Sequence, residues 1–264
     1  MSEDILMTYR PLVYTPGFLL LAVIFCIALF APMLTSYDPE MADLHESEKP
    51  PSITHYFGTD SLGRDVFART LYGTRISLMV GVCAALLTVT LGTCIGICAG
   101  FFGRIIDALL MRIVDTIYSP PETILIIVLI MMFPRSVWAV ILVIGLTHWM
   151  STSRLIRSET LSLKQRPFVE SAIALGAGDF YILRRHILPN LLYVLVISVT
   201  LMTAHAILTE SFLSFLGLGI PPHLASWGNM MNDSQRHIMR GIWWTTLFPG
   251  TMIVITVLSI YLVG

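Results

Sequence analysis

The chain has 264 residues, of which 55% are apolar and only 12% are charged, and its mean hydropathy is +0.78. A soluble domain carries about 25% charged residues, so this composition excludes an ordinary water-soluble protein and predicts an integral membrane protein. The net charge of −1 argues neither for nor against a nucleic-acid partner, whereas the absence of a Lys/Arg-rich run argues against one.

Six apolar runs approach the roughly 20 residues that an α-helix needs to cross a bilayer. Their periodicity is helical wherever it can be read, and no period-two alternation indicates a barrel. We therefore expect an all-α membrane protein with about six transmembrane helices: Gly17–Thr35, Ile76–Phe102, Ile117–Phe133, Val137–Leu155, Leu191–Leu216 and Ile242–Gly264.

The first apolar run is expected to be a retained anchor, because it has no basic leader beyond Arg10 and no clean small-x-small cleavage site. We expect residues 1–75 to form this anchor and an extracytoplasmic loop, and residues 76–264 to form the main transmembrane domain. Within the loop, "GTDSLGRD" (58–65) predicts the start of an external helix, with Thr59 or Asp60 as its cap.

The third run is the least regular of the six. Its lead-in is amphipathic, and Asp115 lies three positions after Arg112, which predicts a structural ion pair. The "SPP" sequence predicts a kink at Pro120–Pro121, because proline removes a backbone hydrogen bond and bends the helix. Glu122 follows this kink, where it would either cap the broken helix or face a transport path.

Charge bias predicts the orientation in the membrane, because Lys and Arg gather in cytoplasmic loops. The segment 154–186 is expected in the cytoplasm, and six spans would place both termini there as well. The acidic loop 36–75 would lie outside. The segment 154–186 holds six of the 16 basic residues: Arg154, Arg157, Lys164, Arg166, Arg184 and Arg185.

One cytoplasmic stretch, "FVESAIALGAGDFYILRRHILPN" (168–190), has the features of an ordered helical hairpin. Pro167 suits the first position of a short helix, and the glycines Gly176 to Gly178 suit its C-terminal end. Asp179 suits the N-cap of a second helix, and Pro189 marks the return to the membrane. A well-formed connector without function is the alternative.

This stretch resembles the EAA loop of ABC importer permeases, which reads Glu-Ala-Ala, three residues, Gly, and a closing Ile-x-Leu-Pro. The chain has Glu170–Ala172, Gly176 at the expected spacing and Leu188–Pro189. It departs from the pattern at Ser171, which replaces the middle alanine, and at His186, which replaces isoleucine. "RRHILPN" is similar to the version in the peptide/nickel branch.

Two further regions, residues 57–78 and 208–233, are similar to that branch and occur in its order. The resemblance is therefore to the C-type permease subunit of dipeptide/oligopeptide/nickel ABC importers, and it covers residues 16–264. Members of the branch usually continue beyond the last span, whereas this sequence ends at Gly264.

The resemblance implies a type I ABC importer permease fold in a multi-pass protein of the bacterial inner membrane. It implies a heterodimer with a sister permease subunit, two ATP-binding subunits, an extracytoplasmic solute-binding protein and surrounding lipid. It also implies a cytoplasmic coupling loop (156–190) that sits on the ATPase through Glu170, Ser171, Ala172, Gly176 and Ala177.

The sequence itself excludes an ATP site in this chain. A P-loop needs a Gly-Lys-Ser/Thr ending, and the only two lysines, Lys49 and Lys164, follow glutamate and leucine. No catalytic motif indicates an enzyme. ATP and Mg²⁺ are therefore expected only in partner subunits, and no cofactor is expected here.

Ionisable residues inside spans are costly and mark candidate transport paths. Glu210, His205 and Glu122 are the candidates here. Simpler interpretations remain: interfacial water for Glu210, and hydrogen-bonded packing for His205 and for His148. The 14 methionines show no ligand spacing, and no His or carboxylate lies near the four cysteines in the sequence, so no metal site is expected.

Transport of di- or oligopeptides is the function that the sequence favours, as half of an ATP-driven translocation path. A permease for nickel or a metal chelate shares the same motifs and stays open. A non-ABC channel or a membrane enzyme is a weaker alternative.

Overall fold

The computed structural model describes residues 3–264, with side chains described for residues 16–235 and 239–264. Within this part of the chain the structure is all-helical and contains no strand. The α-helices are α1 (Glu3–Leu34), α2 (Val66–Phe102), α3 (Arg104–Ile117), α4 (Glu122–Met131), α5 (Val137–Lys164), α6 (Pro167–Ala174), α7 (Asp179–Ile182), α8 (Leu188–Phe215), α9 (Trp227–Ile238) and α10 (Trp244–Val263). A 3₁₀ turn, η1 (Leu44–Glu46), and a π-helical turn, η2 (Leu183–Ile187), complete the elements.

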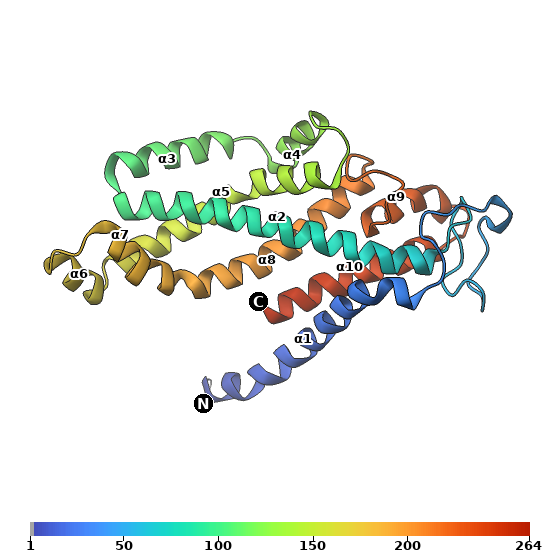
Figure 1. Cartoon of the computed structure of the whole chain (residues 1–264), viewed down its shortest axis with the longest axis horizontal. Coiled ribbons are helices and arrows are strands. Elements are labelled where there is room, and N and C mark those ends of the chain that lie inside the picture. The colour runs from blue at the N-terminus through green and yellow to red at the C-terminus, as the bar shows by residue number, and fades with distance from the viewer. Residues whose placement is uncertain (1–2) are drawn as a thin grey trace.

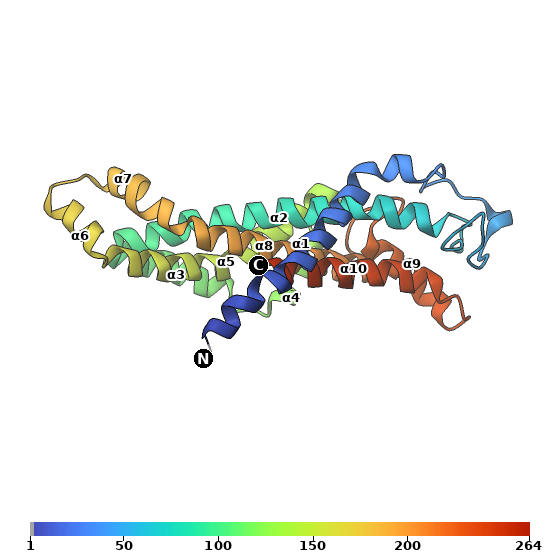
Figure 2. The ribbon, with the colours of Figure 1, turned by 90° about the horizontal axis from the view of Figure 1, so that it is seen from below.

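The molecule is elongated, and its long helices run along its length (Figure 1). The helices α2, α5 and α8 pack on one another, and α1 lies beside α10. The short helices α6 and α7 form one end of the molecule, whereas the loop after α1 and helix α9 form the other, as both ribbon views show (Figure 2).

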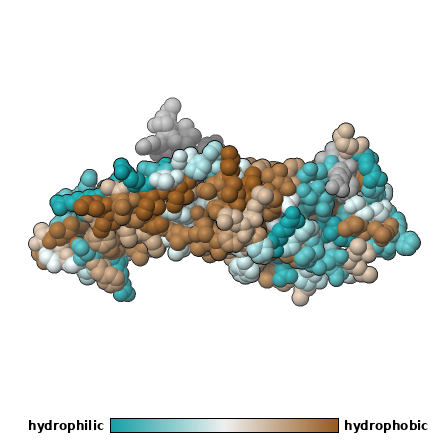
Figure 3. Space-filling view, turned by 90° about the horizontal axis from the view of Figure 1, so that it is seen from above, coloured by the Kyte–Doolittle hydropathy of each residue, from teal (hydrophilic) through white to brown (hydrophobic). Residues whose placement is uncertain are grey.

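Five helices are long and apolar enough to cross a membrane, and the bent pair α3–α4 brings the number of candidate spans to six. Hydrophobic residues dominate the middle of the face in Figure 3, and hydrophilic residues gather at the end formed by α9 and the loop after α1. Large apolar side chains such as Phe18 and Leu19 are exposed on α1. Such surface is stable only in lipid or against another chain.

The second span begins earlier than the apolar run indicates, at Val66 rather than Ile76. Its N-cap is Asp65, whose carboxylate accepts a hydrogen bond from the amide of Ala68 at 2.6 Å. The expectation that Thr59 or Asp60 caps this helix is therefore wrong. At about 1.5 Å per residue, its 37 residues are longer than the roughly 30 Å hydrocarbon core, so one end projects into water.

Hydropathy predicts a span over Ile117–Phe133, but the structure does not contain one continuous helix there. The chain breaks after α3 and bends by 78° before α4. The break contains Pro120–Pro121, which confirms the predicted kink. Helix α4 has ten residues and so covers only about half of the hydrocarbon thickness.

Helix α3, on one side of the break, is tied to α5 by charge pairs. Asp115 lies 2.6 Å from a guanidinium nitrogen of Arg154, rather than pairing with Arg112 as expected. Asp107 accepts two hydrogen bonds from Arg157. Arginines of α5 therefore satisfy both aspartates of α3.

Glycines allow α2 to approach α5 closely. Gly92, Gly96 and Gly100 are spaced four residues apart and share one face of α2. A Cβ atom at Gly96 would lie 2.6 Å from the carbonyl oxygen of Ser153, and one at Gly100 would lie 2.8 Å from Cβ of Thr160. Small residues at this spacing are typical of tightly packed membrane helices.

Candidate functional site

The helical hairpin predicted over residues 168–190 begins as the local sequence predicts. Pro167 occupies the start of α6, and the helix ends before Gly176, whose φ of +79° suits glycine. The amide of Gly176 donates to Ile173 at 2.9 Å, and the amide of Ala177 donates to Ala172 at 3.0 Å. These two bonds form a Schellman motif, which ends the helix and fixes the turn.

The second half of the hairpin differs from expectation. Asp179 is the first residue of α7, and its side chain makes no capping hydrogen bond; Gly178 takes the N-cap position. Helix α7 continues through η2 into α8 without a break at Pro189. The π-helical turn η2 changes the backbone hydrogen-bond pattern just before the proline, which has no amide hydrogen to give.

The five residues of the EAA-like motif lie together at this end of the molecule. Ala172 and Ala177 are half-buried and pack against a core that contains Phe101 and Ile187. Glu170, Ser171 and Gly176 are exposed. The hairpin thus faces its own spans with one side and leaves a carboxylate free on the other.

The exposed side of the hairpin is also apolar. Leu175 is 88% exposed and Phe180 is 75% exposed, and Tyr181 and Ile173 lie on the same surface. Apolar groups beside a charge at the polar end of a membrane protein are typical of a docking surface for another protein.

The three ionisable residues expected near a path separate into two places. Glu210 is completely buried on α8. Its carboxylate accepts hydrogen bonds from Ser214 at 2.8 Å, Ser226 at 3.1 Å and Ser77 at 3.4 Å. This cluster ties α8 to α2 and to the segment that leads into α9.

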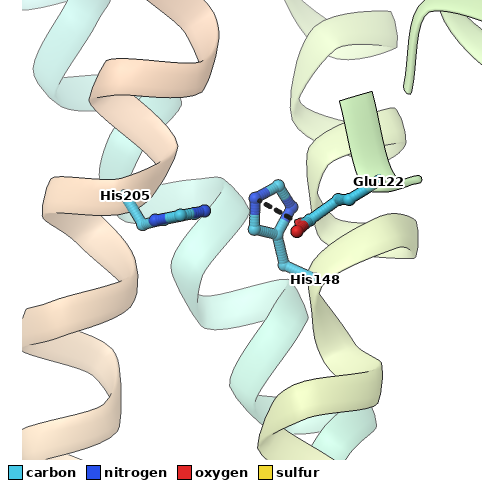
Figure 4. Close-up of side chains that lie close together, drawn as sticks. All are labelled: Glu122, His148 and His205. Carbon is cyan, nitrogen blue, oxygen red and sulfur yellow. Dashed lines mark ion pairs between the residues drawn. The ribbon is translucent and has the colours of Figure 1, made fainter. Parts of the chain in front are cut away.

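Glu122 and His205 lie together in a second place, and His148 lies between them (Figure 4). Nε2 of His148 is 3.1 Å from a carboxylate oxygen of Glu122. The rings of His148 and His205 have centroids 4.8 Å apart. The three side chains come from α4, α5 and α8 and line a cavity of about 270 Å³.

The second nitrogen of His148 faces its own helix. Nδ1 lies 2.9 Å from the carbonyl oxygen of Ile144, and a carbonyl oxygen can only accept, so Nδ1 carries a proton. His148 is nearly buried, His205 is exposed, and the side chain of Glu122 is one-third exposed. The cluster therefore opens from the packed helices toward the outer surface of this chain.

Sequence reasoning treated His148 as a packing residue and missed its place in this cluster. The hydrogen bond to Ile144 agrees with packing, but the other ring nitrogen points at a carboxylate. No spacing rule joins positions 122, 148 and 205, because they meet only through the packing of three helices.

Buried charges hold together the hydrophilic end of the molecule that is formed by α9 and the loop after α1. Arg64 donates to Asp60 at 2.7 Å and to Asp233 at 2.8 Å, which ties the loop after α1 to α9. Nearby, Nδ1 of His55 lies 2.7 Å from Asp65. This network gives the hydrophilic end a defined shape.

These features define a multi-pass membrane protein with polar ends. Residues 92–264 match the family of binding-protein-dependent transport system inner membrane components. The chain belongs to this family, so it is a non-catalytic inner-membrane subunit that carries no cofactor.

Two curated relatives and one solved structure agree. The oligopeptide transport system permease protein OppC of Bacillus subtilis (strain 168) is 38% identical over 94% of this chain and 81% of its own length. The dipeptide transport system permease protein DppC of the same organism is 39% identical over 94% of this chain and 78% of its own length. An inward-facing structure of the MetNI methionine ABC transporter has the same fold, with a TM-score of 0.51 and 16% identity over 72% of this chain and 96% of that one.

Proposed function

We propose that this chain is one of two permease subunits of an ATP-driven importer of di- and oligopeptides, and that it forms half of the translocation path. The observation that carries this proposal is the similarity, at close to 40% identity over nearly the whole chain, to permeases named for oligopeptide and dipeptide transport. The motifs alone are shared with nickel permeases, so the named relatives favour peptides.

The proposed complex contains a sister permease subunit, two ATP-binding subunits and an extracytoplasmic solute-binding protein. The hairpin supports the place of the ATPase, because it offers exposed Leu175 and Phe180 beside the carboxylate of Glu170. A partner with an apolar groove and a basic side chain at its rim would complement it. The opposite end, where Arg64 joins the loop after α1 to α9, is proposed to lie outside the cell membrane and to bind the solute-binding protein.

In this arrangement both termini are cytoplasmic, and the bent pair α3–α4 counts as one of six spans. We retain the division of the chain into an anchor with its outer loop (1–75) and a transmembrane domain (76–264) with its coupling loop (156–190). Closure of the ATPase pair would pull the hairpin. Because α7 and η2 lead directly into α8, that pull reaches a span without a flexible joint.

The path itself is proposed to run past Glu122 and His205, which share one cavity. Intramembrane ionisable groups face water-filled cavities or other protein far more often than lipid. Glu210 is proposed to support the path from behind, through its hydrogen bonds to α2 and the α9 segment.

Uptake measured in cells that lack this gene tests the proposal. Labelled dipeptides and oligopeptides are offered in one arm and labelled nickel in the other, each with and without ATP depletion. We expect peptide uptake to be lost and nickel uptake to persist, with restoration by the intact gene. Loss of nickel uptake alone would assign the metal branch instead, and ATP-independent flux would refute an ATP-driven importer.

A further inference from the structure

In the cluster of Glu122, His148 and His205, two hydrogen-bond acceptors face each other. Because Nδ1 of His148 donates to Ile144, the neutral ring offers only a lone pair at Nε2. The carboxylate of Glu122 also accepts, and the two acceptors lie 3.1 Å apart. Two acceptors at this distance need a proton or a metal cation between or beside them.

We propose that these three residues bind one divalent transition-metal ion of the zinc class, in a site that joins α4, α5 and α8. Two imidazoles and one carboxylate form a ligand set that suits zinc and its neighbours, whereas magnesium and calcium prefer oxygen ligands. This proposal is independent of which solute the permease carries.

The geometry fits such an ion with small movements. One ligand atom from each residue lies within 4.8 Å of the other two. Tetrahedral zinc with bonds of about 2.0–2.1 Å needs ligand atoms about 3.4 Å apart. His148 and Glu122 already meet that spacing, and the exposed ring of His205 is free to turn the remaining distance.

The surroundings of the site match those of known metal centres. A metal-bound histidine usually donates its other ring N–H to a backbone carbonyl or carboxylate, which fixes the ring, as Ile144 does here for His148. The hydroxyl of Thr209 lies 3.5 Å from Nε2 of His148. The cavity of about 270 Å³ has room for a water molecule as the fourth ligand.

The position of the site gives the ion a mechanical role. Helix α4 has only ten residues and follows a bend of 78°. An ion held by α4, α5 and α8 would fix this short helix against two long spans. Bound zinc is therefore expected to slow transport, because the spans that it joins would no longer move independently.

Metal binding by the purified complex of permease and ATPase subunits in lipid nanodiscs tests the proposal. After removal of metals with a chelator, Zn²⁺ binding is measured by equilibrium dialysis, and Co²⁺ is used as a spectroscopic probe. We expect one ion per chain and visible Co²⁺ bands of a tetrahedral site. In His205→Ala the affinity should fall by more than about 10–100-fold, because that is the loss when a residue that only hydrogen-bonds to a metal ligand is removed, and His205 is proposed to bind the ion directly.

Two further variants separate coordination from structure. His205→Cys keeps a zinc ligand, so it should restore binding and add a thiolate band to the Co²⁺ difference spectrum. His223→Ala removes an exposed histidine outside the cluster and should bind as the wild type does. Absence of Zn²⁺ binding in the wild type, or equal binding in His205→Ala, would overturn the proposal, since a proton shared by His148 and Glu122 would then balance the cluster. ATP-dependent peptide uptake is scored separately, so loss of the metal site would leave the importer assignment standing.

Discussion

The carboxylate of Glu210 accepts a hydrogen bond from the hydroxyl of Ser226 at 3.1 Å, and this bond joins α8 to the segment before α9. Ser214 and Ser77 donate to the same completely buried carboxylate. A cluster of this kind is stabilising only while each group keeps its partner, because an unsatisfied buried polar group costs about 1–3 kcal/mol.

Glu210→Ala is therefore expected to lower the stability of the folded permease by several times the cost of one lost hydrogen bond. Glu210→Gln keeps an acceptor oxygen and should be milder. Thermal unfolding of the complex in nanodiscs, followed by the amount of folded protein recovered, measures the difference. Normal stability of Glu210→Ala together with lost uptake would instead assign Glu210 directly to the path.

The packing of α2 on α5 gives a second prediction. Gly96→Leu would place side-chain atoms where a Cβ atom already meets the carbonyl oxygen of Ser153 at 2.6 Å, so the helices must separate. Overpacking of this kind typically costs about 1–3 kcal/mol. Gly178→Ala is the matched control, because its φ is −70° and no atom lies within 4 Å of a Cβ there. The thermal unfolding temperature should fall for Gly96→Leu and stay unchanged for Gly178→Ala. The same unfolding temperature for both variants would contradict tight packing at Gly96.

The ion pair between Asp107 and Arg157 gives a third prediction. Both side chains are partly exposed, so the pair should contribute only about 1 kcal/mol. Asp107→Lys should loosen α3 from α5, since it opposes two positive charges, and the double variant Asp107→Arg, Arg157→Asp should recover much of the loss. Limited proteolysis at the bend between α3 and α4 reports the loosening. A double variant no better than the single one would show that the pair does not hold α3.

The parts of this molecule that follow local rules could be predicted from the sequence. The proline and glycines of the hairpin determine where α6 begins and ends, and the paired prolines determine the bend before α4. The beginning of α2 could not be read from hydropathy, because Val66–Arg75 is helical but carries two charged residues, Arg69 and Arg75. Asp179 was predicted to cap α7, but Gly178 takes the N-cap position and Asp179 is the first residue of the helix.

The candidate site was harder to predict, for a geometric reason. His205 and Glu122 stood out singly as ionisable groups in apolar runs, but their meeting with His148 depends on how α4, α5 and α8 pack. Glu210 also stood out, while the serines that surround it come from α2, α8 and the α9 segment. Tertiary packing, rather than any local motif, decides which polar group finds which partner.

The exposed carboxylate of Glu170 gives the last prediction. If the hairpin contacts an ATPase through a basic side chain of that partner, Glu170→Lys should repel the partner. The fold should be kept, because the side chain of Glu170 is exposed. We expect peptide uptake to fall at least tenfold, the equivalent of about 1.4 kcal/mol of lost coupling. ATP hydrolysis should no longer respond to the binding protein and peptide. Glu170→Asp keeps the charge and should retain most of the uptake, and normal thermal unfolding of Glu170→Lys would show that folding is intact. Wild-type uptake by Glu170→Lys would place the ATPase contact elsewhere, with the apolar surface of Leu175 and Phe180 as the next part of the hairpin to change.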